Sequence, residues 1–134
     1  MTDGPVQYPE LADAQDICDR LGLHIRDAGA LASAVARPAV VVWGEEAYPS
    51  IHLKAAALLD GINRSHPLLD GNKRLSILLV MLLYDLNGFG VRLDPVEGDR
   101  FIRDVAGDGR LELDEIAGWL ADRCHPRGHH PRDT

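Results

Sequence analysis

The stretch from residue 66 to residue 88 most restricts how this chain can fold. Residues 75–83 are apolar at every position except Ser76, and the helical pattern continues to Leu86. Apolar residues on nearly every face are typical of a helix buried on most sides. The run is shorter than the roughly 20 residues that cross a bilayer. It therefore predicts a core helix over residues 72–86, ended by Asn87-Gly88.

A compact polar cluster directly precedes this helix. Residues 66–74 read His-Pro-Leu-Leu-Asp-Gly-Asn-Lys-Arg. A loop entering a helix N-terminus presents free backbone N–H groups and the positive end of the helix dipole, which favour anions. Gly71 allows close approach or positive φ, and Lys73 and Arg74 add positive charge. We expect a phosphate-handling site, with His66 as a base and Asp70 as an oxygen ligand for a metal ion.

These nine residues resemble the signature of the death-on-curing (Doc) toxins within the Fic superfamily, His-x-Phe-x-Asp-(Ala/Gly)-Asn-Lys-Arg. Fic proteins proper carry glycine at the position of Lys73, and usually arginine at the position of Ile77, so both positions place the chain on the Doc side. Leu68 replaces the family's phenylalanine as the apolar anchor of the loop. Residues 26–38 and 109–120 are also similar to Doc proteins, and in that family the first stretch forms a flap beside the active site.

The resemblance implies a toxin of a toxin–antitoxin system that arrests translation. Its reaction would transfer the γ-phosphoryl group of ATP to a Ser or Thr hydroxyl, with elongation factor Tu as the implied substrate. His66 would accept the hydroxyl proton, and Asp70 would hold Mg²⁺. Charge developing during transfer would be offset by Lys73 and Arg74. The expected ligands of the phosphate oxygens are Arg64, Gly71, Asn72, Lys73 and Arg74.

The resemblance also implies a cognate antitoxin whose C-terminal segment folds into a helix against the toxin. We expect its groove near the flap, bordered by residues 29–43 and by the start of the central helix. Small side chains at alternate positions from Ala28 to Ala36 would let another helix approach closely. The alternative is that these alanines face the protein's own core. Glutamate at Ala32 and Ala36 would distinguish the two.

Two other functions remain open at this stage. A Fic-type enzyme would transfer the adenylyl group instead, although Lys73 crowds the pocket that seats the α- and β-phosphates in Fic enzymes. A non-catalytic Doc-fold binding module is the second alternative, and Leu68 is its one sequence hint. Simpler roles also exist for the key residues, since His66 could be an ordinary loop histidine and Asp70 a helix cap.

Two patterns near the C-terminus indicate a metal site less strongly than the cluster at residues 66–74 indicates a phosphate site. Residues 104–115 match most of an EF-hand calcium loop, but Ala106 stands where an oxygen ligand is required. A zinc site could combine Cys124 with His125, His129 and His130, in a short segment rich in proline and glycine.

Composition restricts the remaining function classes. The net charge of −7 and the isoelectric point near 5.2 argue against direct binding to nucleic acid or to a membrane surface. Cys18 and Cys124 are too few and too distant for a disulfide framework, and the N-terminus has no signal-peptide pattern. A cytoplasmic location is the expectation.

The fold class follows from the spacing of apolar residues and helix caps. We expect an all-α bundle of about six helices around a buried central helix, and the resemblance implies that it is of the Fic/Doc type with a short flap. One domain would span residues 1–124, followed by a flexible tail at 125–134. The predicted helices cover residues 9–21, 28–36, 49–63, 72–86, 95–106 and 113–123, with extended segments at 40–44 and 91–93.

Overall fold

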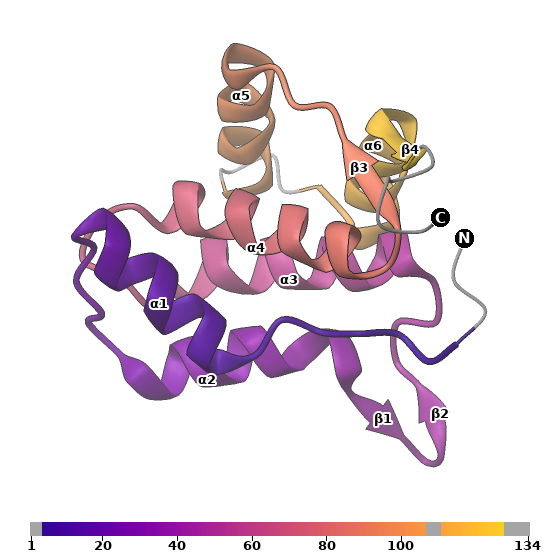
Figure 1. Cartoon of the computed structure of the whole chain (residues 1–134), viewed down its shortest axis with the longest axis horizontal. Helices are drawn as coiled ribbons and strands as arrows, with labels where there is room; N and C mark the ends of the chain where they lie inside the picture. Colours follow the sequence, from indigo (N-terminus) through magenta and orange to yellow (C-terminus); the bar gives the residue numbers. More distant parts are fainter. Residues whose placement is uncertain (1–3, 107–110, 128–134) are drawn as a thin grey trace, which may run out of the picture.

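The computed structural model describes residues 4–106 and 111–127, and these form six α-helices and two small sheets (Figure 1). The helices are α1 (Leu11–Leu21), α2 (Ala28–Ala36), α3 (Ile51–Ser65), α4 (Asn72–Leu86), α5 (Pro95–Ala106) and α6 (Leu113–Arg123). A 3₁₀ turn, η1 (Arg37–Ala39), follows α2. The strands are β1 (Val41–Val42), β2 (Glu45–Glu46), β3 (Phe89–Val91) and β4 (Cys124–Pro126). The all-α fold class predicted from the sequence is confirmed.

Side-chain caps set where the first and third helices begin. The Glu10 N–H donates to Asp13 Oδ2 at 2.7 Å in a capping box, so α1 begins at Leu11 and not at Pro9. Ser50 Oγ accepts from the Leu53 N–H at 3.0 Å, so α3 begins two residues later than predicted.

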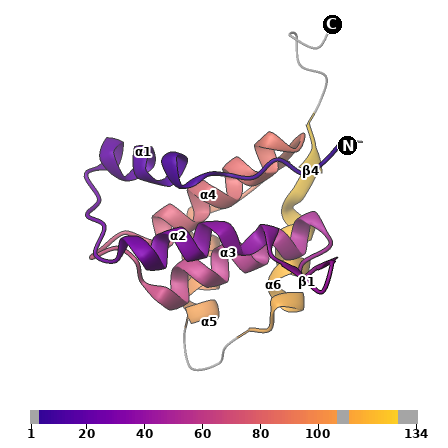
Figure 2. The same cartoon turned by 90° about the horizontal axis from the view of Figure 1, so that it is seen from below.

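The helix at the centre of the bundle is α3. It contacts α2, α4, α5 and α6, and every residue from 54 to 60 is buried (Figures 1 and 2). The sequence pattern had predicted that α4 is the central helix, and this is wrong. One side of α4 packs in the core through residues such as Leu79 and Leu83, while Lys73, Arg74 and Met81 are exposed. The outer side is exposed because it forms the floor of grooves beside α5 and the β3–β4 sheet.

The first turns of α3 hold two polar side chains that other parts of the chain shield from solvent. Lys54 is 1% exposed, and its Nζ donates to Glu46 Oε1 at 3.0 Å and to the Tyr48 carbonyl. His52 Nδ1 lies 2.8 Å from the Tyr84 hydroxyl. Burial raises the pKa of Tyr84, so this hydroxyl stays protonated. Their partners come from other segments of the chain that cover this end of α3.

The half-buried His52 predicts a lower stability of the fold in mild acid. Burial lowers the pKa of His52 from its usual 6.5, so below about pH 6.5 the unfolded chain binds a proton that the folded chain does not. Stability should therefore decrease as the pH falls through this window. Thermal melting at pH 7.5 and pH 5.5 should show a smaller loss for His52→Gln than for the native chain. Equal losses of melting temperature in the two chains would mean that His52 does not contribute to the pH dependence of stability.

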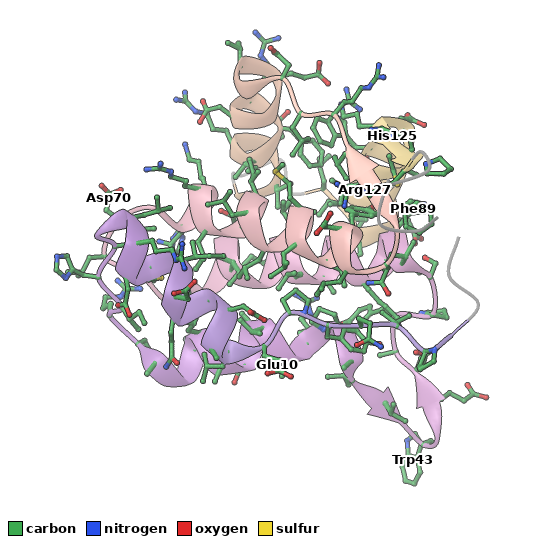
Figure 3. All side chains as sticks on the ribbon, in the orientation of Figure 1. Glu10, Trp43, Asp70, Phe89, His125 and Arg127 are labelled. Atoms are coloured by element: carbon green, nitrogen blue, oxygen red, sulfur yellow. The ribbon has the colours of Figure 1, made fainter. Side chains whose placement is uncertain are left out.

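The β1–β2 hairpin projects from the N-terminal end of α3. It pairs Val41 with Glu46 and Val42 with Glu45, and it carries Trp43 at its tip with 97% of the residue exposed. The sequence analysis predicted an extended segment at 40–44 and placed residues 29–43 along a groove near the flap beside the site. The 15 residues of α3, about 22 Å of helix, instead separate it from His66. Figure 3 accordingly places Trp43 and Asp70 at opposite ends of the molecule.

The second sheet corrects the predicted start of the C-terminal tail. Pro126 and His125 belong to β4 and pair with Phe89 and Gly90 of β3 (Figure 3). Gly90 permits this approach, because a Cβ there would lie 2.6 Å from the His125 ring. The pairing joins segments on either side of α5 and α6, so no local pattern indicates it. The rest of the predicted tail, residues 128–134, lies outside the described part of the chain.

Candidate functional site

The loop between α3 and α4 places His66 in an uncommon backbone conformation. His66 follows the last residue of α3 with φ 48° and ψ 59°, and its N–H donates to the Ile62 carbonyl at 3.1 Å. The His66 carbonyl accepts from the Arg26 guanidinium. A non-glycine residue at positive φ persists only where its surroundings hold it, and such residues are concentrated at functional sites. The exposed imidazole makes no hydrogen bond to any described residue.

The segment between α1 and α2 clamps this loop. The backbone N–H groups of Arg26 and Asp27 donate to the Pro67 carbonyl at 2.8 and 3.0 Å, and the Leu69 N–H donates to the His24 carbonyl at 3.0 Å. The sequence analysis assigned no role at the site to His24, nor to the Arg26 side chain. Only the Doc-like phrase beginning at Arg26 pointed to this region, and no local pattern indicates which groups it touches.

Leu68 and Asn72 close the loop from inside. Leu68 is 1% exposed and forms a β-bridge with Ile25, so the predicted role of Leu68 as an apolar anchor is confirmed. Asn72 Oδ1 accepts from the Leu68 N–H at 2.9 Å, and Asn72 Nδ2 donates to the Leu68 carbonyl at 3.1 Å. The Asn72 amide was expected to bind phosphate, but here it is committed to fixing the loop.

Asp70 and Gly71 lead directly into α4. Asp70 Oδ1 accepts from the Gly71 N–H at 2.9 Å, while Oδ2 has no partner among the described residues. Gly71 adopts φ 91°, and a Cβ there would lie 2.8 Å from a Leu23 methyl group, so glycine is required. No side chain caps α4. Asp70 therefore does not act as its cap, and the first N–H groups of the helix can face an anion.

The three cations expected at the site differ in availability. Arg64 forms an ion pair with the buried Asp60, one turn earlier on α3. Lys73 Nζ lies 3.2 Å from Asp99 Oδ1 on α5. Arg74 is exposed and has no ion pair within residues 4–106 and 111–127. Arg74 is thus the most accessible cation, while Arg64 is held in place as part of the scaffold.

A groove opens beside Lys73 and Arg74. It has a volume of about 420 Å³ and lies between the outer face of α4, α5 and the segment after β3. The floor is mostly apolar, and charged side chains stand at its edges. The lining residues are Lys73, Arg74, Ile77, Met81, Val91, Leu93, Asp94, Gly98, Asp99 and Ile102. An apolar floor with convergent charged groups suits a ligand with an apolar part and an anionic part.

Comparison with known proteins shows the family of this chain. The model of the Fic/DOC family matches residues 8–84, which include α1–α3, the site loop and most of α4. The chain belongs to the Fic/DOC family. The chain is also 39% identical over 100 residues to Toxin Doc of Mycolicibacterium smegmatis, an alignment that covers 74% of this chain and 77% of that protein. Proteins of the Fic/DOC family are generally transferases.

The metal alternatives find no support in the described residues. No group of three or more His, Cys, Asp or Glu side chains there could hold a metal ion. Residues 107–110 of the calcium-loop pattern and both His129 and His130 of the zinc pattern lie outside those residues. Asp70 could still contribute to a Mg²⁺ site, because Mg²⁺ commonly takes one or two carboxylates and completes its shell with water and substrate phosphates.

In the described ranges, no helix is both long and apolar enough to cross a membrane.

Proposed function

We propose that this Fic/DOC protein is a Doc-like toxin that transfers the γ-phosphoryl group of ATP to a Ser or Thr hydroxyl of a cytoplasmic protein. The observation that carries the proposal is one clamped loop in which His66 and Asp70 flank the entry to the uncapped α4. The relative named Toxin Doc supports the toxin assignment. The substrate we propose is elongation factor Tu, on the family resemblance.

His66 is the proposed general base. As the hydroxyl oxygen of the substrate forms its bond to the γ-phosphorus, its proton passes to the imidazole and ADP leaves. The imidazole is exposed and makes no hydrogen bond to the described residues, so it is free to meet a substrate. The backbone of His66 is held at both ends, because its N–H donates to the Ile62 carbonyl and its carbonyl accepts from the Arg26 guanidinium. Neither hydrogen bond uses the ring.

Mg²⁺ fits beside Asp70. One carboxylate oxygen holds the loop through the Gly71 N–H, and the other is available to the ion. When bound, Mg²⁺ would neutralise charge on the phosphates. In this proposal the first N–H groups of the uncapped α4 and the Arg74 guanidinium would bind phosphate oxygens. The groove beside Lys73 and Arg74 would receive the remainder of ATP.

The proposal is tested by incubating the purified chain with isotope-labelled ATP, Mg²⁺ and elongation factor Tu, followed by mass spectrometry. Phosphoryl transfer adds about 80 Da to the target and adenylyl transfer adds about 329 Da. We expect the smaller mass on a Ser or Thr residue. The larger mass would establish the adenylyl-transfer alternative, and no modification together with no ATP binding would favour a non-catalytic module.

A groove for an inhibiting partner is proposed between α2 and α3. It has a volume of about 300 Å³ and is mostly apolar. Along α2 and the first residue of η1 its lining positions recur at i, i+3, i+4 and i+7. The partner we propose is the helical C-terminal segment of an antitoxin. The lining residues are Ala30, Ser33, Ala34, Arg37, Val40, Gly61 and Ser65. None comes from α4, which had been expected to border the groove, and neither Ala32 nor Ala36 lines it.

A glutamate in this groove should weaken antitoxin binding without unfolding the chain. Ser33 is exposed on α2, so Ser33→Glu would place bulk and charge in the groove at little cost to the core. We expect the Kd for the antitoxin to rise roughly tenfold or more, because the partner would have to desolvate the new charge. Ala36→Glu is the matched control, since Ala36 is exposed on the same helix outside the groove. Equal effects of the two variants in a titration would place the antitoxin elsewhere.

A further inference from the structure

The Lys73 ammonium group on α4 is held by a carboxylate on α5, within the same groove. Asp99 Oδ1 on α5 lies 3.2 Å from Lys73 Nζ, and Asp99 Oδ2 lies 2.9 Å from Arg103 Nε. Asp99 therefore shares its charge between one cation from α4 and one from its own helix. The Lys73 and Asp99 side chains are each 47% exposed, so the pair is accessible to a ligand in the groove.

The position of Asp99 is set by packing between α5 and α6. The Phe101 ring stacks on the Trp119 indole with centroids 3.8 Å apart, and the Arg123 guanidinium covers the same indole at 3.7 Å. Arg123 then forms an ion pair with Glu97 on α5. Because α5 is held in this way, the Asp99 carboxylate stands at a fixed place opposite the start of α4.

We propose that Asp99 sets the affinity for the nucleotide by competing with its phosphates for Lys73. This inference rests on the proposed function. Without nucleotide, Lys73 is paired with Asp99; with nucleotide, Lys73 moves to a phosphate oxygen and Asp99 keeps Arg103 as its partner. Asp99 is thus an internal substitute for the phosphate and not a catalytic residue.

The direction of the effect follows from charge. An ammonium group that is already paired must lose one partner to gain another, and that loss makes nucleotide binding less favourable. Removing the Asp99 charge leaves Lys73 unpaired and available to the phosphate. An exposed ion pair contributes little, so the change in Kd should be roughly two- to fivefold and should shrink at high salt.

The test is calorimetric titration of Mg·ATP into full-length variants that also carry His66→Ala, which removes the proposed base and permits expression. We expect Asp99→Asn to lower the Kd for ATP about two- to fivefold, and Asp99→Glu to restore it. In a Lys73→Ala background, Asp99→Asn should have no effect. With His66 restored, the KM for ATP should fall while kcat stays unchanged.

Asp94→Asn is the matched control. Asp94 lines the same groove, but its side chain accepts from the Glu97 N–H at 3.0 Å, a cap that asparagine also supplies. Equal effects of Asp94→Asn and Asp99→Asn, or an effect that survives without Lys73, would overturn the proposal. Either result would mean that any negative charge in the groove weakens ATP binding. A raised Kd in Asp99→Asn would overturn it as well. If the chain with native Asp99 and Lys73 binds no ATP, the proposed function itself fails.

Discussion

Replacing His66 with alanine is expected to remove transfer activity while leaving the chain folded. The imidazole is exposed and makes no hydrogen bond to the described residues, so its removal leaves no cavity in the core. Loss of a general base lowers a rate by roughly 10²–10⁴-fold. The measurement is the initial rate of ³²P transfer from labelled ATP to the target protein, with circular dichroism to confirm folding.

The control for this variant is His24→Ala. His24 is also exposed and belongs to the segment that clamps the loop, but its hydrogen bond to Leu69 uses only the backbone carbonyl. It should keep near-native activity. Asparagine at position 66 provides a second check, because asparagine tolerates the positive φ of this site better than alanine. A folded His66→Asn variant that transfers phosphate at the native rate would exclude His66 as the base.

Replacing Asp70 with asparagine should have the second large effect. The amide oxygen can still accept from the Gly71 N–H, so the loop keeps its shape. The negative charge that attracts Mg²⁺ is lost, and metal-assisted charge stabilisation is worth several kcal/mol. We therefore expect a loss of activity of about 100-fold or more, together with a higher Mg²⁺ concentration for half-maximal rate.

Asp85→Asn is a suitable comparison, because Asp85 is an exposed carboxylate at the other end of α4, paired with Arg127. Its Mg²⁺ dependence should match that of the native chain. If Asp70→Asn retains full activity in excess chelator, Asp70 does not bind a catalytic metal, and the proposed mechanism loses its metal site.

The sequence by itself determined the elements that depend on neighbouring residues. Helices α2, α4 and α6 have the predicted bounds, because an Asp27 cap, the Asn87-Gly88 stop and the apolar periodicity are all local signals. The nine residues from His66 to Arg74 also identified the candidate site and its family. That cluster is contiguous, so its chemistry could be recognised without knowing what packs around it.

The tertiary structure decided which of those side chains are free to act. Asn72 closes the loop on Leu68, Arg64 is bound to Asp60, and Lys73 is shared with α5. It also decided that α3, not α4, is central, because burial depends on which helices surround a segment. Similarly, the clamp from Arg26 joins groups 40 residues apart. Such contacts follow from how the helices pack, and periodicity within one segment holds no information about its distant neighbours.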